Sequence, residues 1–263
     1  MLCTIDVGNT QTVIGLFTPD DTRRGEPLHH WRVSTVASRT ADELAQQLEA
    51  LLALKGLDAR RTITGVAVAS VVPRLRTATR EMTDRWLGVE TVIVEPGIKT
   101  GMPILYDNPR EVGADRIADA VAAYDLYGGP TIVVDFGTAT TFEVVSDKGE
   151  YLGGVILPGI EISLEALFAR AALLPRVELV EPRSVLAKNT VESVQSGVIY
   201  GFAAQVDGLC RRLKAEVGDH CHVIGTGGLA GLIGPVSEEI EHHEPWLTLH
   251  GLRLIFARNQ RPV

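Results

Sequence analysis

The sequence contains one strand-and-turn pattern twice, and this duplication constrains the fold more than any other feature. Residues 4–17 are TIDVGNTQTVIGLF, and residues 133–146 are VVDFGTATTFEVVS. In each segment an apolar run ends on an aspartate, a glycine follows two positions later, and a threonine follows six positions after the aspartate. The aspartates, Asp6 and Asp135, are separated by nearly half of the 263-residue chain. We therefore predict an internal duplication, with two similar α/β domains that face each other across a central cleft.

Hydrophobic patterns around the two turns predict alternating strands and helices. Thr40 and Glu43 have the spacing of a capping box, so a helix should start at residue 41. Residues 95–112 are rich in Gly, Pro and Asn, which favours a long and functional loop. We expect two domains, at residues 1–113 and 114–263. The expected strands are 2–5, 12–17, 28–33, 65–72, 91–94, 132–135, 141–145 and 223–224, and residues 153–159 are expected to form a turn, a strand and another turn. The expected helices are 41–54, 75–87, 114–126, 160–171 and 191–217, and a helix or strand is expected near 252–256.

Composition narrows the class of protein. The net charge is −8 without a run of lysines or arginines, so a nucleic-acid partner is not expected. Three cysteines, at positions 3, 210 and 221, are too few and odd in number for a disulfide framework, and they suit a reducing compartment. We find no signal peptide and no apolar run near the ~18–20 residues that span a bilayer. The expected location is therefore the cytoplasm, without a membrane partner.

Each of the two predicted turns has a composition that suits phosphate binding. Gly-Asn-Thr and Gly-Thr-Ala offer consecutive backbone N–H groups and hydroxyls, and glycine lets the backbone approach a phosphate closely. The neighbouring Asp6 and Asp135 could hold a cation that neutralises phosphate charge. Two such hairpins would clamp a nucleotide polyphosphate; the alternative is a pair of tight turns in which aspartate only forms the turn. GTGGLA at 225–230 favours a Gly-rich turn beside the nucleotide.

A third element, YDNPREVGADR at residues 106–116, offers a carboxylate and a guanidinium to a substrate. Gly113 precedes the predicted helix, so Asp115 and Arg116 fall in its first turn, where negative charge is stabilised. A carboxylate there could accept a proton from a substrate hydroxyl, and the arginine could hold a carboxylate or phosphate. The alternative is that both are ordinary capping or surface residues. Asp119, one turn later, is expected to be a solvated surface charge.

Neither the histidine pairs nor Cys210, in the long predicted helix, is expected to form a functional site. His29 and His30, His220 and His222, and His242 and His243 form near pairs without a third ligand at metal spacing, so no zinc site is predicted. Cys210 lies on an apolar helical face and is expected to pack rather than to react.

Taken together, the motifs DVGNTQT, YDNPREVGADR, DFGTATTFEVV, GGVILPG, KNT at 188–190 and GTGGLA closely resemble the type III pantothenate kinases. The resemblance extends from residue 4 to about residue 255, in consistent order. It implies the fold of the acetate kinase, sugar kinase, Hsp70 and actin superfamily, with two duplicated actin-like (ribonuclease H-like) domains. It also implies ATP-dependent phosphorylation of pantothenate in the cytoplasm, with Mg²⁺, by a homodimer.

The resemblance further implies a role for each matching residue. Asp115 is expected to be the general base on the primary hydroxyl of pantothenate. Asp135 resembles the ligand of a monovalent cation, K⁺ or NH₄⁺, and Thr190 resembles a residue that reaches the pantothenate site from the neighbouring subunit. The expected ATP contacts are Asp6, Val7, Gly8, Asn9, Thr10, Gln11, Thr12, Val13 and Thr138, and the expected pantothenate pocket is Tyr106, Gly113, Ala114, Asp115 and Arg116.

Two other functions compete with this one. The chain could be a catalytically weak relative that binds nucleotide as an accessory or regulatory protein, although its full set of three aspartates argues against that. It could instead be another small-molecule kinase or phosphatase of the superfamily. One departure from the family pattern is Glu143, which stands where many relatives have aspartate.

Overall fold

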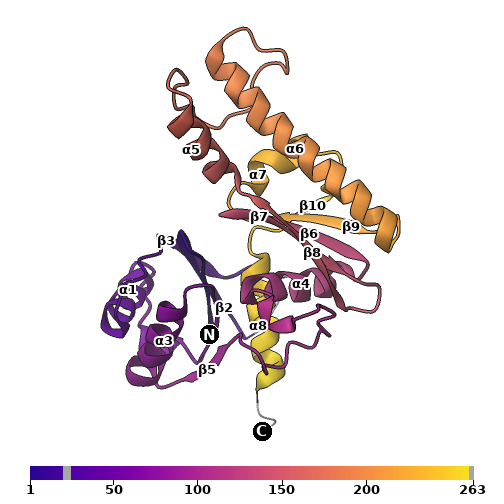
Figure 1. Ribbon diagram of the computed structural model, residues 1–263. Coiled ribbons are helices and arrows are strands. Elements are labelled where there is room, and N and C mark those ends of the chain that lie inside the picture. Colours follow the sequence, from indigo (N-terminus) through magenta and orange to yellow (C-terminus); the bar gives the residue numbers. More distant parts are fainter. Residues whose placement is uncertain (20–24, 261–263) are drawn as a thin grey trace. The chain divides into compact units, whose positions relative to one another are not determined.

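The chain forms two compact α/β units, each built on a five-stranded sheet. The computed structural model describes residues 1–19 and 25–260 (Figure 1). Unit 1 comprises residues 1–126 and 246–263, and unit 2 comprises residues 127–245. Among the described residues, no helix is long and apolar enough to cross a membrane.

The sheet of unit 1 has the strand order β3-β2-β1-β4-β5. Strands β1, β2 and β3 pair antiparallel in chain order, whereas β4 and β5 are parallel to β1. The strands are β1 (Leu2–Val7), β2 (Gln11–Phe17), β3 (His29–Ser34), β4 (Gly65–Ser70) and β5 (Glu90–Ile93).

Helices cover both faces of this sheet. Side chains alternate between the faces of a strand, so Cys3, Ile5 and Val7 form one core with α1 and α3. On the other face, Gly15 and Gly65 let the side chains of α8 approach the backbone of β2 and β4. The helices of unit 1 are α1 (Ala41–Ala53), α2 (Ala59–Thr62), α3 (Pro73–Met82) with the π-helical turn η1 (Thr83–Leu87), the 3₁₀ turn η2 (Pro109–Glu111), α4 (Ala114–Tyr127, of which residue 127 falls in unit 2) and α8 (Leu247–Asn259).

Unit 2 repeats the sheet topology of unit 1, as the sequence duplication predicts. Its strand order is β10-β9-β6-β7-β8. Read from the other edge, as β8-β7-β6-β9-β10, it corresponds strand by strand to the order β3-β2-β1-β4-β5 of unit 1. Strands β6, β7 and β8 pair antiparallel, and β9 and β10 run parallel to β6. The strands are β6 (Thr131–Phe136), β7 (Ala139–Val145), β8 (Tyr151–Pro158), β9 (His222–Thr226) and β10 (His242–His243).

The core of unit 2 lies between one face of its sheet and three helices. Ile132, Val134 and Phe136 of β6 point into this core, so Asp135 points to the opposite face. From the helices, Leu164, Ile199 and Ile233 complete it. The helices are α5 (Ile160–Arg170), α6 (Thr190–Val217) and α7 (Ala230–Ile233), followed by the 3₁₀ turn η3 (Gly234–Val236).

The division into units differs from the boundary expected at residue 113. The first unit also contains the residues of α4 up to Leu126, and it includes a second segment that begins at Trp246. The reason is tertiary packing. Helix α8 returns to the sheet of unit 1, and Gly251 allows it to approach α4 so closely that a Cβ there would overlap the Ala118 carbonyl. The segment near residues 252–256, for which the sequence allows either a helix or a strand, is helical.

The two hairpins match in sequence but differ by one residue in register. In unit 1, Asp6 pairs with Val13 and Thr12 pairs with Val7. In unit 2, Asp135 pairs with Thr141. The first loop therefore has one residue more, and the two threonines at equal sequence offsets occupy non-equivalent ladder positions. A sequence offset counts residues along the chain and cannot show which residues pair across it.

Candidate active site

The first hairpin presents Asp6 and an exposed turn. Asp6 is half-buried at the end of β1, and Asn9, Thr10 and Gln11 are exposed. The turn closes through the Gly8 N–H, which donates to the Gln11 carbonyl at 3.0 Å. A Cβ on Gly8 would lie only 3.0 Å from that oxygen, so glycine fits this turn best. The geometry supports a turn whose backbone can approach an anion closely.

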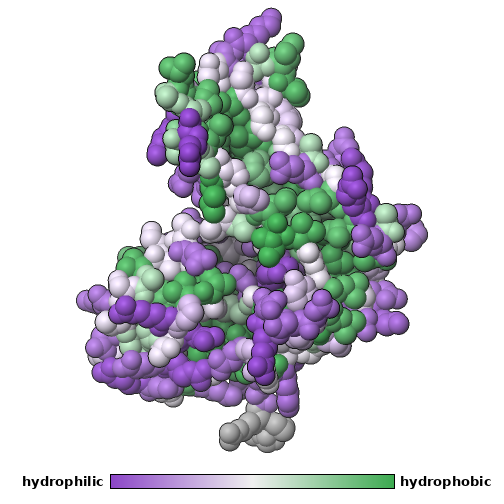
Figure 2. Space-filling model, viewed as in Figure 1, coloured by the Kyte–Doolittle hydropathy of each residue, from purple (hydrophilic) through white to green (hydrophobic). Residues whose placement is uncertain are grey.

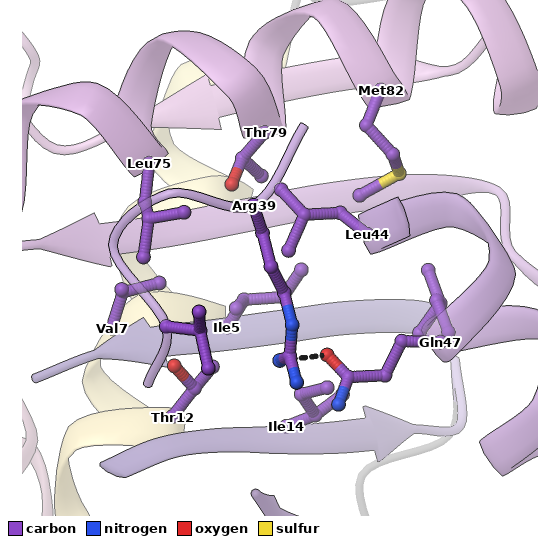
Figure 3. A pocket seen from close by; sticks show the side chains of 12 residues that line it. Ile5, Val7, Thr12, Ile14, Arg39, Leu44, Gln47, Leu75, Thr79 and Met82 are labelled. Carbon is purple, nitrogen blue, oxygen red and sulfur yellow. Dashed lines mark hydrogen bonds between the residues drawn. The ribbon is translucent and has the colours of Figure 1, made fainter. Parts of the chain in front are cut away.

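A small enclosed pocket lies beneath this hairpin, on the face of the sheet covered by α1 and α3 (Figure 3). It holds about 30 Å³, which is room for roughly a water molecule or two rather than a nucleotide. Ile5, Val7 and Leu75 make much of its wall apolar, and Arg39 donates to the Gln47 amide oxygen at 2.6 Å across it. The pocket by itself is therefore too small for a nucleotide.

Thr12 is oriented into that core by a hydroxyl partner. Its Oγ1 lies 2.8 Å from Oγ1 of Thr35, and the Thr35 N–H donates to the Thr10 carbonyl at 2.9 Å. The segment after β3 thus braces the turn from one side. Thr35 was not among the predicted site residues, because the pairing between hairpin and segment is visible only in three dimensions.

The second hairpin holds Asp135 between two glycines. A Cβ on Gly137 would lie 3.4 Å from Asp135 Oδ2. Gly227 has a φ of +89°, and a Cβ there would overlap Asp135 Oδ1 and lie 2.7 Å from the Phe136 nitrogen. The GTGG segment, which is expected beside the nucleotide, lies beside Asp135, since Thr226 pairs with Asp135 across β6 and β9.

The N-terminus of α5 abuts the same turn. Gly159 is the N-cap of α5, and a Cβ on it would overlap the Thr138 carbonyl and lie 2.7 Å from the Gly137 carbonyl. Thr138 itself is exposed at the tip of the turn. A helix N-terminus beside an exposed turn is a favourable environment for an anion. Gly159 belongs to the GGVILPG motif, which sequence analysis identified without assigning it a role.

Asp115 stands at the start of α4, as predicted. The Ile117 N–H donates to the Gly113 carbonyl, so Gly113 is the first capping residue of the helix. Asp115 Oδ1 accepts the Arg116 N–H at 2.9 Å and folds back over Gly113, where a Cβ would collide with it. Asp115 is half-buried, so its carboxylate is positioned by the helix start and remains reachable by a substrate.

Asp6 and Asp115 occupy the same side of the unit 1 sheet. Asp6 follows the alternation of Thr4 and therefore points to the face that α8 covers. Helix α4, which begins with Ala114, packs on α8 through Gly251. The structure thus brings two of the three predicted aspartates to one side of unit 1. Asp135 belongs to unit 2.

The loop that leads to α4 is held by α8. Asn259 accepts the Lys99 N–H at 3.2 Å and donates to the Lys99 carbonyl at 2.9 Å. Arg258 donates to the Thr100 carbonyl, which lies beside Gly101 with its φ of +76°. Tyr106 is half-buried further along this loop. The predicted long loop is confirmed, and its attachment to the C-terminal helix could not be read from the sequence.

Thr190 opens helix α6 and borders an apolar groove. The groove lies between α5 and α6 and encloses about 400 Å³. Leu167, Leu174 and Phe202 line it together with Thr190. Nearby large apolar side chains are unusually exposed, and Figure 2 shows them as green atoms over α5 and the segment that leads to α6. They are Leu173 (95% exposed), Leu186 (79%), Val185 (67%), Ile162 (45%), Val191 (43%) and Leu167 (41%).

Two minor expectations have different outcomes. Asp119 is not a surface charge: it is 1% exposed, because the face of α4 that carries it is buried.

The interpretation of Cys210 as a packing residue is supported, since burial raises the pKa of its thiol to about 12. Burial likewise raises the pKa of Cys3 to about 12 and that of Cys221 to about 11. All three are therefore protonated at neutral pH and are poor nucleophiles.

Comparison with known proteins decides the family. The profile of the family described as type III pantothenate kinase matches residues 2–212. The chain belongs to the type III pantothenate kinase family. A type III pantothenate kinase of Streptomyces griseus is 57% identical over 98% of both chains. One from Moorella thermoacetica is 54% identical over 98% of this chain and all of its own.

A solved structure supports the fold of this type III pantothenate kinase family member. The activator of 2-hydroxyisocaproyl-CoA dehydratase from Clostridium difficile, solved with bound ADPNP, superimposes with a TM-score of 0.56 at 14% identity. The superposition covers 100% of this chain and 98% of that one. Together with the repeated sheet topology, this identifies the two units as duplicated actin-like domains, as the sequence predicts.

Proposed function

We propose that this protein transfers the γ-phosphoryl group of ATP to the primary hydroxyl of pantothenate and forms 4′-phosphopantothenate, the first step of coenzyme A biosynthesis. The observation that carries the proposal is the 57% identity to a type III pantothenate kinase over 98% of both chains. Phosphoryl transfer requires positioning and charge stabilisation more than covalent chemistry, and the site supplies carboxylates, glycine-rich turns and a helix N-terminus.

Asp115 is the general base in this proposal. As the hydroxyl oxygen bonds to the γ-phosphorus and ADP leaves, the Asp115 carboxylate accepts the hydroxyl proton. The Arg116 N–H at 2.9 Å and the folded-back position over Gly113 orient the carboxylate. Arg116, Tyr106, Gly113 and Ala114 form the pantothenate pocket around it. Arg116 offers the guanidinium that a carboxylate-bearing substrate such as pantothenate requires.

Residues Asp6 to Val13 of the first hairpin are the ATP contacts of unit 1 in this proposal, as the family resemblance implies. Thr138, in the turn of the second hairpin, is likewise assigned to ATP by that resemblance. Asp6 offers carboxylate oxygens, the ligand type that Mg²⁺ prefers. When bound, Mg²⁺ would neutralise phosphate charge. Asp135 binds the monovalent cation, K⁺ or NH₄⁺. A carboxylate supplies the oxygen ligands that such a cation takes, and Gly137 and Gly227 allow the backbone to lie close to it.

A coupled assay of the purified protein tests this function. We expect ADP release that depends on pantothenate and Mg²⁺ and that falls when K⁺ and NH₄⁺ are replaced by Na⁺ at equal ionic strength. Glycerol, acetate and glucose serve as control acceptors and should give no ADP. Binding of ATP without any product would instead support an accessory role. Equal rates in Na⁺ and K⁺ would refute only the cation assignment to Asp135.

The protein also acts as a homodimer in this proposal, through the apolar surface around the groove of α5 and α6. Exposed contiguous apolar side chains are unusual on a monomer and are typical of an interface. Thr190 lies on this surface, so a second copy seated there would receive Thr190 at its pantothenate site. The cytoplasm is the proposed location, which the three buried free thiols support.

The dimer proposal predicts that Leu173→Asp produces a monomer. Placing a charge on a side chain that is 95% exposed should leave the fold intact but prevent burial in an interface. Light scattering after size exclusion should give twice the chain mass for the wild type and the single mass for the variant. The KM for pantothenate should rise about tenfold if Thr190 contributes a hydrogen bond from the partner. Leu54→Asp, at a leucine of unit 1 that is 76% exposed, is the control and should remain dimeric. A dimeric Leu173→Asp variant would contradict the interface.

A further inference from the structure

Three possible metal ligands meet at one edge of the unit 2 sheet, outside the proposed active site. They are His222, which opens β9, and Glu241 and His242, at the start of β10. Nδ1 of His222 lies 3.1 Å from Oε2 of Glu241, and Nε2 of His242 lies 3.9 Å from the same oxygen. All three ligand atoms lie within 4.8 Å of one another. The expectation that the histidine pairs lack a third ligand is therefore wrong for this cluster.

The parallel pairing of β9 and β10 brings these residues together. His242 is registered with Ile224, and Ile224 lies two positions after His222 on the same face of the sheet. The two imidazoles consequently project from one face, with ring centroids 5.9 Å apart. The Glu241 N–H donates to the Val223 carbonyl at 2.9 Å and fixes the backbone of the third residue. The sequence pairs His222 with His220 and His242 with His243, so this arrangement depends on the tertiary fold.

The distances suit a small transition-metal ion. Bonds of about 2.0–2.1 Å to nitrogen and oxygen place the ligands of a tetrahedral Zn²⁺ roughly 3.3 Å from one another. The distances of 3.1 and 3.9 Å bracket this value, and no two of the three ligand atoms are more than 4.8 Å apart, so adjustments of up to ~1.5 Å would close the site. We propose that His222, Glu241 and His242 bind one Zn²⁺ ion through two imidazole nitrogens and a carboxylate oxygen. Water completes the coordination, as in other sites with three protein ligands.

The surroundings of the cluster fit this occupant. The ligand side chains are 37–44% exposed, so an ion can enter from solvent. The Tyr127 ring stacks on His242 with centroids 4.2 Å apart and an interplanar angle of 20°, which restrains the imidazole. Lys214 lies 3.8 Å from Glu241 but closer to Glu239, at 2.9 Å, so Glu241 can turn to a metal while the lysine keeps a partner.

The donor set also separates this site from the magnesium of the proposed reaction. Imidazole suits Zn²⁺, whereas Mg²⁺ prefers oxygen ligands and retains its waters. The ion would hold β10 to β9, because β10 is a two-residue strand, His242–His243, at the edge of the sheet. Binding to the folded state alone stabilises that state, so Zn²⁺ should raise the melting temperature.

Competition with a chromophoric chelator tests the site on protein freed of metal with EDTA. We expect one equivalent of Zn²⁺ to bind to the wild type, with a higher melting temperature and no displacement by millimolar Mg²⁺. His222→Ala and His242→Ala should each weaken binding at least about tenfold, the loss that even outer-shell substitutions cause. Co²⁺ should give the visible d–d absorption of a tetrahedral site in the wild type, and both variants should lose it.

His243→Ala is the matched control, because this neighbouring histidine is exposed and is not a member of the cluster. It should bind Zn²⁺ as the wild type does. Equal Zn²⁺ affinity of the wild type and a His222→Ala/His242→Ala double variant would overturn the proposal, as would failure of the wild type to compete with the chelator. Metal-free melting temperatures of the variants distinguish a lost ligand from a lost fold. None of these measurements depends on kinase activity.

Discussion

Asp115→Asn should reduce pantothenate-dependent ADP formation by at least about 100-fold, the lower end of what a general base contributes. Asparagine has nearly the shape of aspartate and can still accept the Arg116 N–H through its amide oxygen, so the helix start should persist. It cannot take up a proton from the substrate hydroxyl at neutral pH. The loss should therefore fall on kcat, with little change in melting temperature or in ATP binding measured by calorimetry.

Asp84→Asn is the control for this substitution. Asp84 is exposed in the turn after α3, and the variant has the same change in charge and shape. It should retain the wild-type kcat. If Asp115→Asn also kept most of its activity, the assignment of Asp115 as the base would be wrong, whatever the chain phosphorylates.

Gly113→Ala tests the position of the same carboxylate without removing it. The backbone at residue 113 is compatible with alanine, but the new methyl group would collide with Asp115 Oδ1. A side chain can rotate away at small cost, so stability should change little while the base leaves its place. We expect a fall in kcat larger than the change in KM for ATP. An unaltered kcat would show that the folded-back position over Gly113 is not the productive one.

Gly251→Ala should destabilise unit 1 by about 1–3 kcal/mol, the usual cost of forcing extra volume into a packed core. Its Cβ would overlap the Ala118 carbonyl of α4, and a backbone atom of a neighbouring helix cannot rotate away as a side chain can. Helices α8 and α4 would have to separate, and α8 also covers the sheet. Thermal unfolding followed by circular dichroism should show a melting temperature lower by about 2–12 °C, at roughly 2–4 °C per kcal/mol for a protein of this size.

Gly208→Ala is the matched control, because the same substitution in the middle of α6 meets no atom within 4 Å. Alanine is favoured over glycine in a helix interior by about 0.5–1 kcal/mol, so this variant should be equally or more stable than the wild type. The two glycine-to-alanine changes should therefore act in opposite directions. A Gly251→Ala variant as stable as Gly208→Ala would contradict the close packing of α8 on α4.

Local signals in the sequence predicted much of the secondary structure correctly. Thr40 and Glu43 form the expected capping box, with the Glu43 N–H donating to Thr40 Oγ1 at 3.3 Å and Glu43 accepting the Thr40 N–H at 2.7 Å. Such signals succeed because the interacting groups lie within one turn of each other along the chain. The two-residue strand β10 was missed, since His242 and His243 carry no alternation long enough to detect.

Predictions about exposure and partners were less secure. Asp119 was expected on the surface because its charge is the local signal, yet it lies buried on α4. The cluster of His222, Glu241 and His242 was missed because its members come from separate strands. The composition of the GTGGLA segment predicts that it lies near the nucleotide. The contact of Gly227 with Asp135 depends on the pairing of β9 with β6, which the sequence does not show.

The sequence by itself determined the duplication, the family and the residues proposed for chemistry, because each is encoded in short segments whose order and composition suffice. Tertiary structure alone decided that the last helix belongs to the first unit and that the hairpins differ by one residue in register. It also decided that Gly227 lies beside Asp135 and which histidines meet at the edge of the second sheet. These features depend on contacts between segments far apart in the chain, and packing in three dimensions selects those contacts.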